Sequence, residues 1–201
     1  MMHKDTRIVF VHQGNRWYLP YVMRQAVSVN KSAHDVTLLG DTEHGDGVST
    51  VPLEGLRSVW SDQFVKLYEH MSTNSERFEL FCWLRWFYLL QYMQLEHVTH
   101  VLHLDTDVLL YSSIQELHGV YGGMMTDCGL MVPEQDFSSF MWFASGHISY
   151  WTRAFLERFC DFVLRSFKDY GLTLCSIAQI LLNASLQKSP RSSRQAICHR
   201  C

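Results

Sequence analysis

The stretch that decides the fold is Val101-Leu102-His103-Leu104-Asp105-Thr106-Asp107-Val108-Leu109-Leu110, near the middle of the 201-residue chain. A short apolar run with polar boundaries is typical of a strand buried in a parallel sheet. Two carboxylates, those of Asp105 and Asp107, follow where the run ends. Open α/β sheets bind ligands at the carboxyl ends of their strands. The pair is therefore a candidate site for a hard divalent cation, because such cations prefer oxygen ligands.

The residues before this stretch predict a sheet that is mostly parallel. Residues 7–11 are apolar and β-branched, residues 17–29 have helical spacing, and residues 35–41 form a second strand pattern that ends in a turn. Strand, helix and strand within about 40 residues predict a βαβ unit. Residues 48–53 predict a third, shorter strand, and Pro52 places it at an edge of the sheet.

The apolar segment over residues 72–92 predicts a buried helix, because its large side chains point in nearly every direction. Thr73 and Glu76 have the spacing of a capping box at its start. The remaining predicted elements follow in order: a short capped helix at residues 112–117, a loop with one strand at 119–129, a strand at 140–144, a turn at 145–147, and helices at 150–167 and 176–186.

Arg85 is a charged residue in the middle of that buried helix. A charge in such a place must be paired or reach solvent. One interpretation is a structural ion pair with Glu79 or Glu96, and the other is that Arg85 points into a ligand site near the strand ends. The sequence leaves both open.

Composition limits the classes of protein that this chain can belong to. It is 47% hydrophobic and 18% charged, which is typical of a globular domain. Its net charge of -3 argues against nucleic acid as a main partner, and no apolar run is long enough for a membrane span. We expect one domain over residues 1–187 and an atypical tail over residues 188–201, where Cys198 and Cys201 form half of a zinc motif without a second half.

The expected compartment is the cytoplasm, because the N-terminus lacks a signal-peptide core and the cysteine usage fits a reducing environment. A Golgi lumenal location is the alternative if an N-terminal anchor is missing.

Three interpretations compete for Asp105 and Asp107. The first is metal-bridged binding of a diphosphate, since Mg²⁺ or Mn²⁺ needs few protein oxygens when phosphates complete its shell. The second is a phosphatase of the haloacid-dehalogenase type, although its further acidic pair is absent downstream and three predicted strands come before the motif strand. The third is a strand end with two solvated acids.

Three segments of the chain resemble nucleotide-sugar-dependent glycosyltransferases of the GT-A fold. They are residues 78–87, with an Arg-aromatic pair, residues 101–110, with Asp-x-Asp, and residues 145–151, with a glycine-containing turn. The resemblance covers residues 7–185. It implies a single Rossmann-like α/β domain with a mostly parallel sheet flanked by helices, and transfer of a sugar from a nucleoside-diphosphate sugar to an acceptor hydroxyl.

The resemblance also implies roles for individual residues. Asp107 resembles the direct ligand of Mn²⁺ or Mg²⁺, and Asp105 resembles the residue that contacts the ribose or the metal and its water shell. The other candidates surround them: Gln13 and Asn15 beside the nucleoside, Asp41 in the same pocket, Arg85 near the donor, and His147 on the acceptor side. His147 has the alternative of an ordinary turn or core histidine. Transfer with inversion needs a general base on the acceptor side, and the candidates for it are His147, Glu134 and Asp136.

The end of the chain departs from this family. Members usually continue further and bring another metal ligand there, commonly a histidine, whereas residues 188–201 have no strand-like pattern. A catalytically inactive nucleotide-sugar-binding protein is therefore an alternative to an active enzyme. The acceptor, whether carbohydrate, protein or lipid, is not specified by the sequence.

Overall fold

A six-stranded sheet in the order β3-β2-β1-β4-β6-β5 organises the computed structural model, which describes residues 5–30, 35–42, 48–131 and 145–170. Its strands are β1 (Arg7–Val11), β2 (Val36–Leu39), β3 (Ser49–Val51), β4 (His100–Leu104), β5 (Cys128–Met131) and β6 (Ser145–Thr152). The strands from β3 to β4 pair in parallel, whereas β6 runs antiparallel to both β4 and β5. The predicted edge position of the third strand is confirmed.

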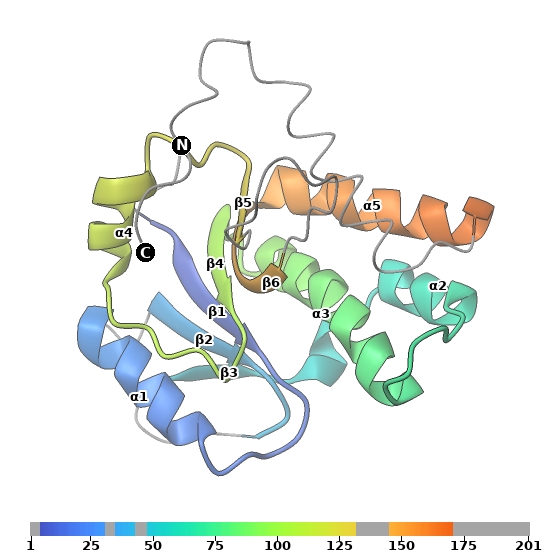
Figure 1. Ribbon diagram of the computed structural model, residues 1–201, viewed down its shortest axis with the longest axis horizontal. Helices are drawn as coiled ribbons and strands as arrows, with labels where there is room; N and C mark the ends of the chain where they lie inside the picture. Colours follow the sequence, from blue (N-terminus) through green and yellow to red (C-terminus); the bar gives the residue numbers. More distant parts are fainter. Residues whose placement is uncertain (1–4, 31–34, 43–47, 132–144, 171–201) are drawn as a thin grey trace.

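Helices cover both faces of the sheet (Figure 1). One face packs against α1 (Leu19–Asn30) and α4 (Ile114–Tyr121), and the other packs against α2 (Val59–Leu67), α3 (Glu76–Leu95) and α5 (Arg153–Tyr170). A short 3-10 turn, η2 (Leu53–Leu56), leads into α2.

Burial on both faces explains why the first strand is a continuous apolar run. Successive side chains of a strand point to opposite faces. Ile8 and Phe10 enter the core beneath α1, while Val9 and Val11 enter the core beneath α3. Each fully buried side chain of this size contributes about 1.5–3 kcal/mol of hydrophobic free energy.

The predicted start of α3 is wrong. Its N-cap is Ser75, which makes no side-chain capping bond, and Glu76 is the first residue of the helix rather than its third. Thr73 and Glu76 therefore do not form a capping box. The residue that organises the approach to the helix is Glu79, whose carboxylate accepts hydrogen bonds from the side chains of Ser72 and Asn74.

The predicted turn at residues 145–147 and the predicted helix start at residue 150 are also wrong. Residues 145–152 form β6, and α5 begins at Arg153. Tyr150 and Trp151 are both buried but enter the cores on opposite faces of the sheet, because successive side chains of a strand alternate between its two faces. Pairing with β4, where Leu102 lies opposite Tyr150, explains why these aromatic residues extend the sheet instead of the helix.

Several predicted features lie outside the described residues. They are the strand at 140–144, the helix at 176–186, the tail with its cysteine pair, and the candidate bases Glu134 and Asp136. Among the helices that the structure describes, none has the length and apolar character needed to cross a membrane.

Candidate active site

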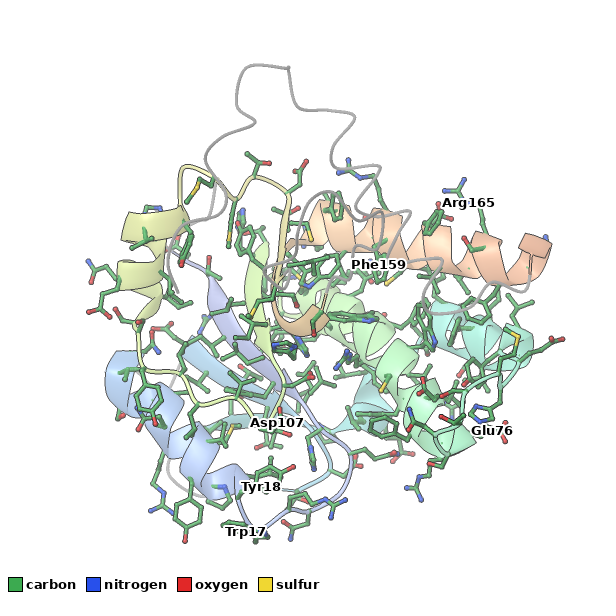
Figure 2. All side chains as sticks on the ribbon, in the orientation of Figure 1. Trp17, Tyr18, Glu76, Asp107, Phe159 and Arg165 are labelled. Atoms are coloured by element: carbon green, nitrogen blue, oxygen red, sulfur yellow. The ribbon has the colours of Figure 1, made fainter. Side chains whose placement is uncertain are left out.

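Asp105, Thr106 and Asp107 follow β4 directly, at the carboxyl end of a central strand. The Val108 N–H donates to the Asp105 carbonyl oxygen at 3.0 Å, so the chain turns immediately after the strand. The Asp105 N–H donates across to the His147 carbonyl oxygen on β6 at 2.8 Å. Figure 2 labels Asp107 in this turn. The two carboxylates thus stand at the edge of the sheet where the sequence predicts a ligand.

Arg85 on α3 forms an ion pair with the first carboxylate. Its Nη1 donates to Asp105 Oδ1 at 2.6 Å, and the two side chains are 18% and 30% exposed. The guanidinium also lies over the Trp86 ring, 4.7 Å from the centroid. The partner is therefore neither Glu79 nor Glu96, and the predicted choice of acid is wrong. Arg85 therefore forms an ion pair, as the first interpretation predicts, and it does so at the strand ends, as the second interpretation predicts.

Gly146 lets β6 approach α3 closely enough for this arrangement. A Cβ atom at this position would lie 2.7 Å from Trp86 Cζ2 and 3.5 Å from Arg85 Nη2. The first distance is too short for any side chain. The predicted importance of a glycine near residue 146 therefore has a steric cause, although the residue lies in a strand rather than a turn.

His103 is a buried histidine of β4 that is not among the predicted site residues. Its Nδ1 lies 3.1 Å from the Gly146 carbonyl oxygen and 3.3 Å from the Ser149 hydroxyl, so Nδ1 donates to the carbonyl in one tautomer and accepts from the hydroxyl in the other. Its Nε2 lies 3.8 Å from Asp105 Oδ1 and has no hydrogen-bond partner among the described residues. Burial, and then the neighbouring Arg85 charge, lower the pKa of His103 to about 3, so the imidazole is neutral at physiological pH.

The two-residue repeat of a strand is the feature of the sequence that could have identified His103. His103 stands two residues before Asp105 and therefore faces the same side of the sheet.

Asp107 is exposed, and within the described part of the chain no hydrogen bond or ion pair engages its carboxylate. Mg²⁺ in phosphate sites commonly takes only one or two protein carboxylates, with phosphate oxygens and waters as its other ligands. The described residues contain no group of three or more His, Cys, Asp or Glu side chains that could form a closed cage. The exposed Asp107 carboxylate therefore fits a cation that is shared with a phosphate ligand.

The loops after β1 and β2 lie at the same edge of the sheet. Gln13 and Asn15 are exposed in the first loop, which turns at Gly14 with a φ of 88°. Asp41 is exposed after β2. The loops touch near Gly40, where a Cβ atom would lie 3.1 Å from the His12 carbonyl oxygen. These predicted nucleoside-side residues therefore share one edge with the carboxylate pair, but no side-chain hydrogen bond to another described residue fixes any of them.

His147 reaches this edge from β6 and is half-buried. Its backbone carbonyl holds Asp105, and its Nδ1 hydrogen-bonds the Ser145 hydroxyl. The His147 N–H also points to Ser145 Oγ at 3.5 Å. The predicted acceptor-side histidine is therefore tied to the carboxylate pair through the main chain of β6, and its ring is oriented by Ser145.

No family model matches the sequence, and no curated protein matches it. Among solved structures, the chain is similar to apo mouse xyloside xylosyltransferase 1, with a TM-score of 0.55, 10% identity, and coverage of 90% of this chain and 82% of that chain. An active-site mutant of LgtC gives a TM-score of 0.48 at 14% identity, covering 94% of this chain and 81% of that chain. A cytidylyltransferase from Leptospira borgpetersenii gives 0.44 at 13% identity, covering 92% and 72%.

At these identities the likeness concerns the fold, and we base the comparison on the xylosyltransferase. Its similarity and the six-stranded, mostly parallel sheet between two helical layers confirm the predicted single α/β domain of the GT-A type.

Proposed function

We propose that this protein is a glycosyltransferase that moves a sugar from a nucleoside-diphosphate sugar to an acceptor hydroxyl. The observation that carries the proposal is the division of the Asp105–Asp107 pair. Asp105 is neutralised by Arg85 at 2.6 Å, whereas Asp107 is exposed at the strand end. One open carboxylate beside a neutralised one is suited to a cation that arrives together with a diphosphate.

The fold supports this proposal, because the similar mouse protein is named a xylosyltransferase. In an open α/β sheet the carboxyl ends of the strands form the ligand crevice. The loops after β1, β2 and β4 meet there, and they carry Gln13, Asn15, Asp41 and the carboxylate pair. A donor would extend along these ends, with its nucleoside over the loops after β1 and β2 and its diphosphate at Asp107.

In this proposal Asp107 would hold Mn²⁺ or Mg²⁺, with Asp105 beside it. The cation would offset the negative charge that develops on the departing diphosphate. Arg85 holds Asp105 in place and offsets its negative charge at the edge where the diphosphate would lie. Neutral His103 adds no charge beneath that pair.

On the acceptor side, His147 is the candidate base within the described residues. Its Nδ1 hydrogen-bonds the Ser145 hydroxyl, which orients the ring at this edge of the sheet. Nε2 would serve as the base towards an acceptor hydroxyl in the tautomer that leaves it unprotonated.

The test is a thermal-shift screen of nucleotide-sugars and nucleoside diphosphates with Mn²⁺ present, followed by calorimetry of each hit. A ligand that binds only the folded state raises the melting temperature. We expect at least one hit that needs Mn²⁺ and that disappears in Asp107→Ala. Glu157→Ala is the matched control, because it removes an exposed acid from α5, away from the carboxyl ends of the strands. A ligand that binds Asp107→Ala as tightly as the wild type would show that Asp107 does not hold the metal ion.

An inactive binding protein remains the second candidate, and its separate test is hydrolysis. An active transferase site releases some free sugar from its donor, whereas a binding relic with the same affinity releases none. The fold does not support the phosphatase interpretation, in which the motif strand would come first in the chain. Here β4 is the fourth strand in chain order, and it lies between β1 and the antiparallel β6. Assays on simple phosphate esters would separate it from both.

We keep the cytoplasm as the proposed compartment. The cysteines of the described residues, Cys82, Cys128 and Cys160, are all free thiols, which agrees with a reducing environment.

A further inference from the structure

A side-chain hydrogen bond joins the ends of two neighbouring strands at the candidate site. Thr106 Oγ1 lies 3.0 Å from His12 Nδ1. Phe10 pairs with Leu104, so His12 and Thr106 each stand two positions beyond the last pair of the β1–β4 ladder. The His12 N–H donates in the other direction, to the Leu39 carbonyl oxygen of β2 at 2.9 Å. His12 therefore connects the ends of β2, β1 and β4 where the backbone ladder stops.

Thr106 and Asp107 are adjacent but differ in burial. Thr106 is 7% exposed, whereas Asp107 is exposed and its carboxylate has no partner within the described part of the chain. The position of that carboxylate therefore depends on its backbone, which is fixed by the tight turn after β4 and by the inward bond of Thr106. The same His12 begins the loop that carries Gln13 and Asn15.

We propose that Thr106 and His12 are positioning residues that set the spacing between the Asp107 carboxylate and the loop at residues 13–15. This inference rests on the proposed function. A nucleoside diphosphate would be bound at two points, its phosphates at Asp107 and its nucleoside at the loop. Two linked contacts reinforce each other only when their spacing matches the ligand. The Thr106–His12 bond holds that spacing before the ligand arrives, and neither residue needs to touch the ligand.

The test compares Thr106→Val, which keeps the shape and removes the hydroxyl, with Thr106→Ser, which keeps the hydroxyl. Calorimetry with Mn²⁺ measures the affinity for UDP, GDP and CDP, each alone, and for inorganic pyrophosphate, which has phosphates but no nucleoside. A single hydrogen bond contributes about 1 kcal/mol, so we expect about fivefold weaker binding of the nucleoside diphosphate by Thr106→Val. Pyrophosphate affinity should change by less than about twofold, and Thr106→Ser should bind like the wild type.

Thr50→Val is the matched control for loss of a hydroxyl. Thr50 lies on the edge strand β3, and its Oγ1 is buried without a hydrogen-bond partner among the described residues. We expect this variant to bind both probes like the wild type. His12→Phe should reproduce the effect of Thr106→Val, and the double variant should show no further loss, because both changes break one bond. If Thr106→Val does not fold, His12→Phe carries the same comparison.

The outcomes separate this inference from the proposed function. A wild-type protein that binds no nucleoside diphosphate with Mn²⁺ overturns both. A wild-type protein that binds, together with a Thr106→Val variant of unchanged affinity, overturns the positioning role alone. Equal losses for the nucleoside diphosphate and for pyrophosphate also overturn it, because they indicate a general loosening of the site and not a lost spacing.

Discussion

The Arg85–Asp105 pair offers the sharpest test of how this site is built. We consider Arg85→Met, which keeps most of the side-chain length but removes the charge. The pair is 2.6 Å long and its side chains are 18% and 30% exposed, so solvent screens it only in part. A hydrogen bond between charged groups contributes about 1.5–3 kcal/mol, and stacking of the guanidinium on Trp86 adds about 0.5–1 kcal/mol. After a reduction for partial exposure, we expect Arg85→Met to lose about 2–3 kcal/mol.

Urea denaturation measures that loss directly, and thermal denaturation should show it as a melting temperature about 4–12 °C lower in a domain of this size. The double-mutant cycle with Asp105→Asn isolates the pair itself. We expect a coupling free energy of at least about 1 kcal/mol, because the second change removes a charge that the first has left unpaired. Additive losses within about 0.5 kcal/mol would refute the view that Arg85 neutralises Asp105.

The chain supplies a matched control in Arg57 and Asp62, whose atoms are 2.7 Å apart but whose side chains are 63% and 47% exposed. Solvent screens an exposed pair of this kind, so it contributes little to stability. Arg57→Met should therefore cost clearly less than Arg85→Met. A similar cost for both Arg→Met variants would show that burial at the strand ends is not what makes the Arg85 pair stable.

Three further predictions concern other parts of the fold. Gly146→Ala should destabilise the protein by about 1–3 kcal/mol in urea, because its Cβ would lie 2.7 Å from Trp86, and Trp86→Leu should relieve part of that loss. The folded-state pKa of His103 is lowered to about 3, so below pH 6.5 the unfolded chain binds a proton that the folded chain does not, and the free energy of unfolding should fall by about 1.4 kcal/mol per pH unit from about 6.5 towards 3. The difference between the stability curves of the wild type and of His103→Gln isolates this slope. Parallel curves would contradict the prediction. Ser113→Ala should cost about 1 kcal/mol, because Ser113 and Glu116 form a capping box at the start of α4, and an unchanged urea midpoint would contradict it.

The parallel half of the sheet could be predicted because each of its signals is local. The first strand is a continuous apolar run because helices bury it on both faces, and a hairpin strand with one wet face would have alternated instead. The short capped helix predicted at residues 112–117 could be read for the same reason, because Ser113 and Glu116, which form the capping box of α4, are three residues apart.

β6 could not be predicted as a strand, because its strand character depends on a distant partner. Tyr150, Trp151 and the aromatic residues that follow also fit one face of a helix, and only pairing with β4 separates them. The partner of Arg85 could not be predicted for the same reason. The sequence suggests acids close to Arg85 along the chain, whereas its partner, Asp105, is twenty residues away, directly after the next strand.

The spacing Asp-Thr-Asp acquires a physical meaning from these contacts. In an extended strand, residues two apart face the same side, so the sequence predicts two carboxylates at one opening. The chain instead turns directly after Asp105, and the three side chains separate. Asp105 pairs with Arg85 on α3, Thr106 bonds His12 at the end of β1, and Asp107 alone is exposed and unpartnered among the described residues. Because Asp105 and Thr106 are each bonded to a different element, α3 and the end of β1, the backbone of Asp107 is held in place without use of its carboxylate oxygens. Those oxygens therefore stay available for a ligand, which is the property that a shared cation site requires.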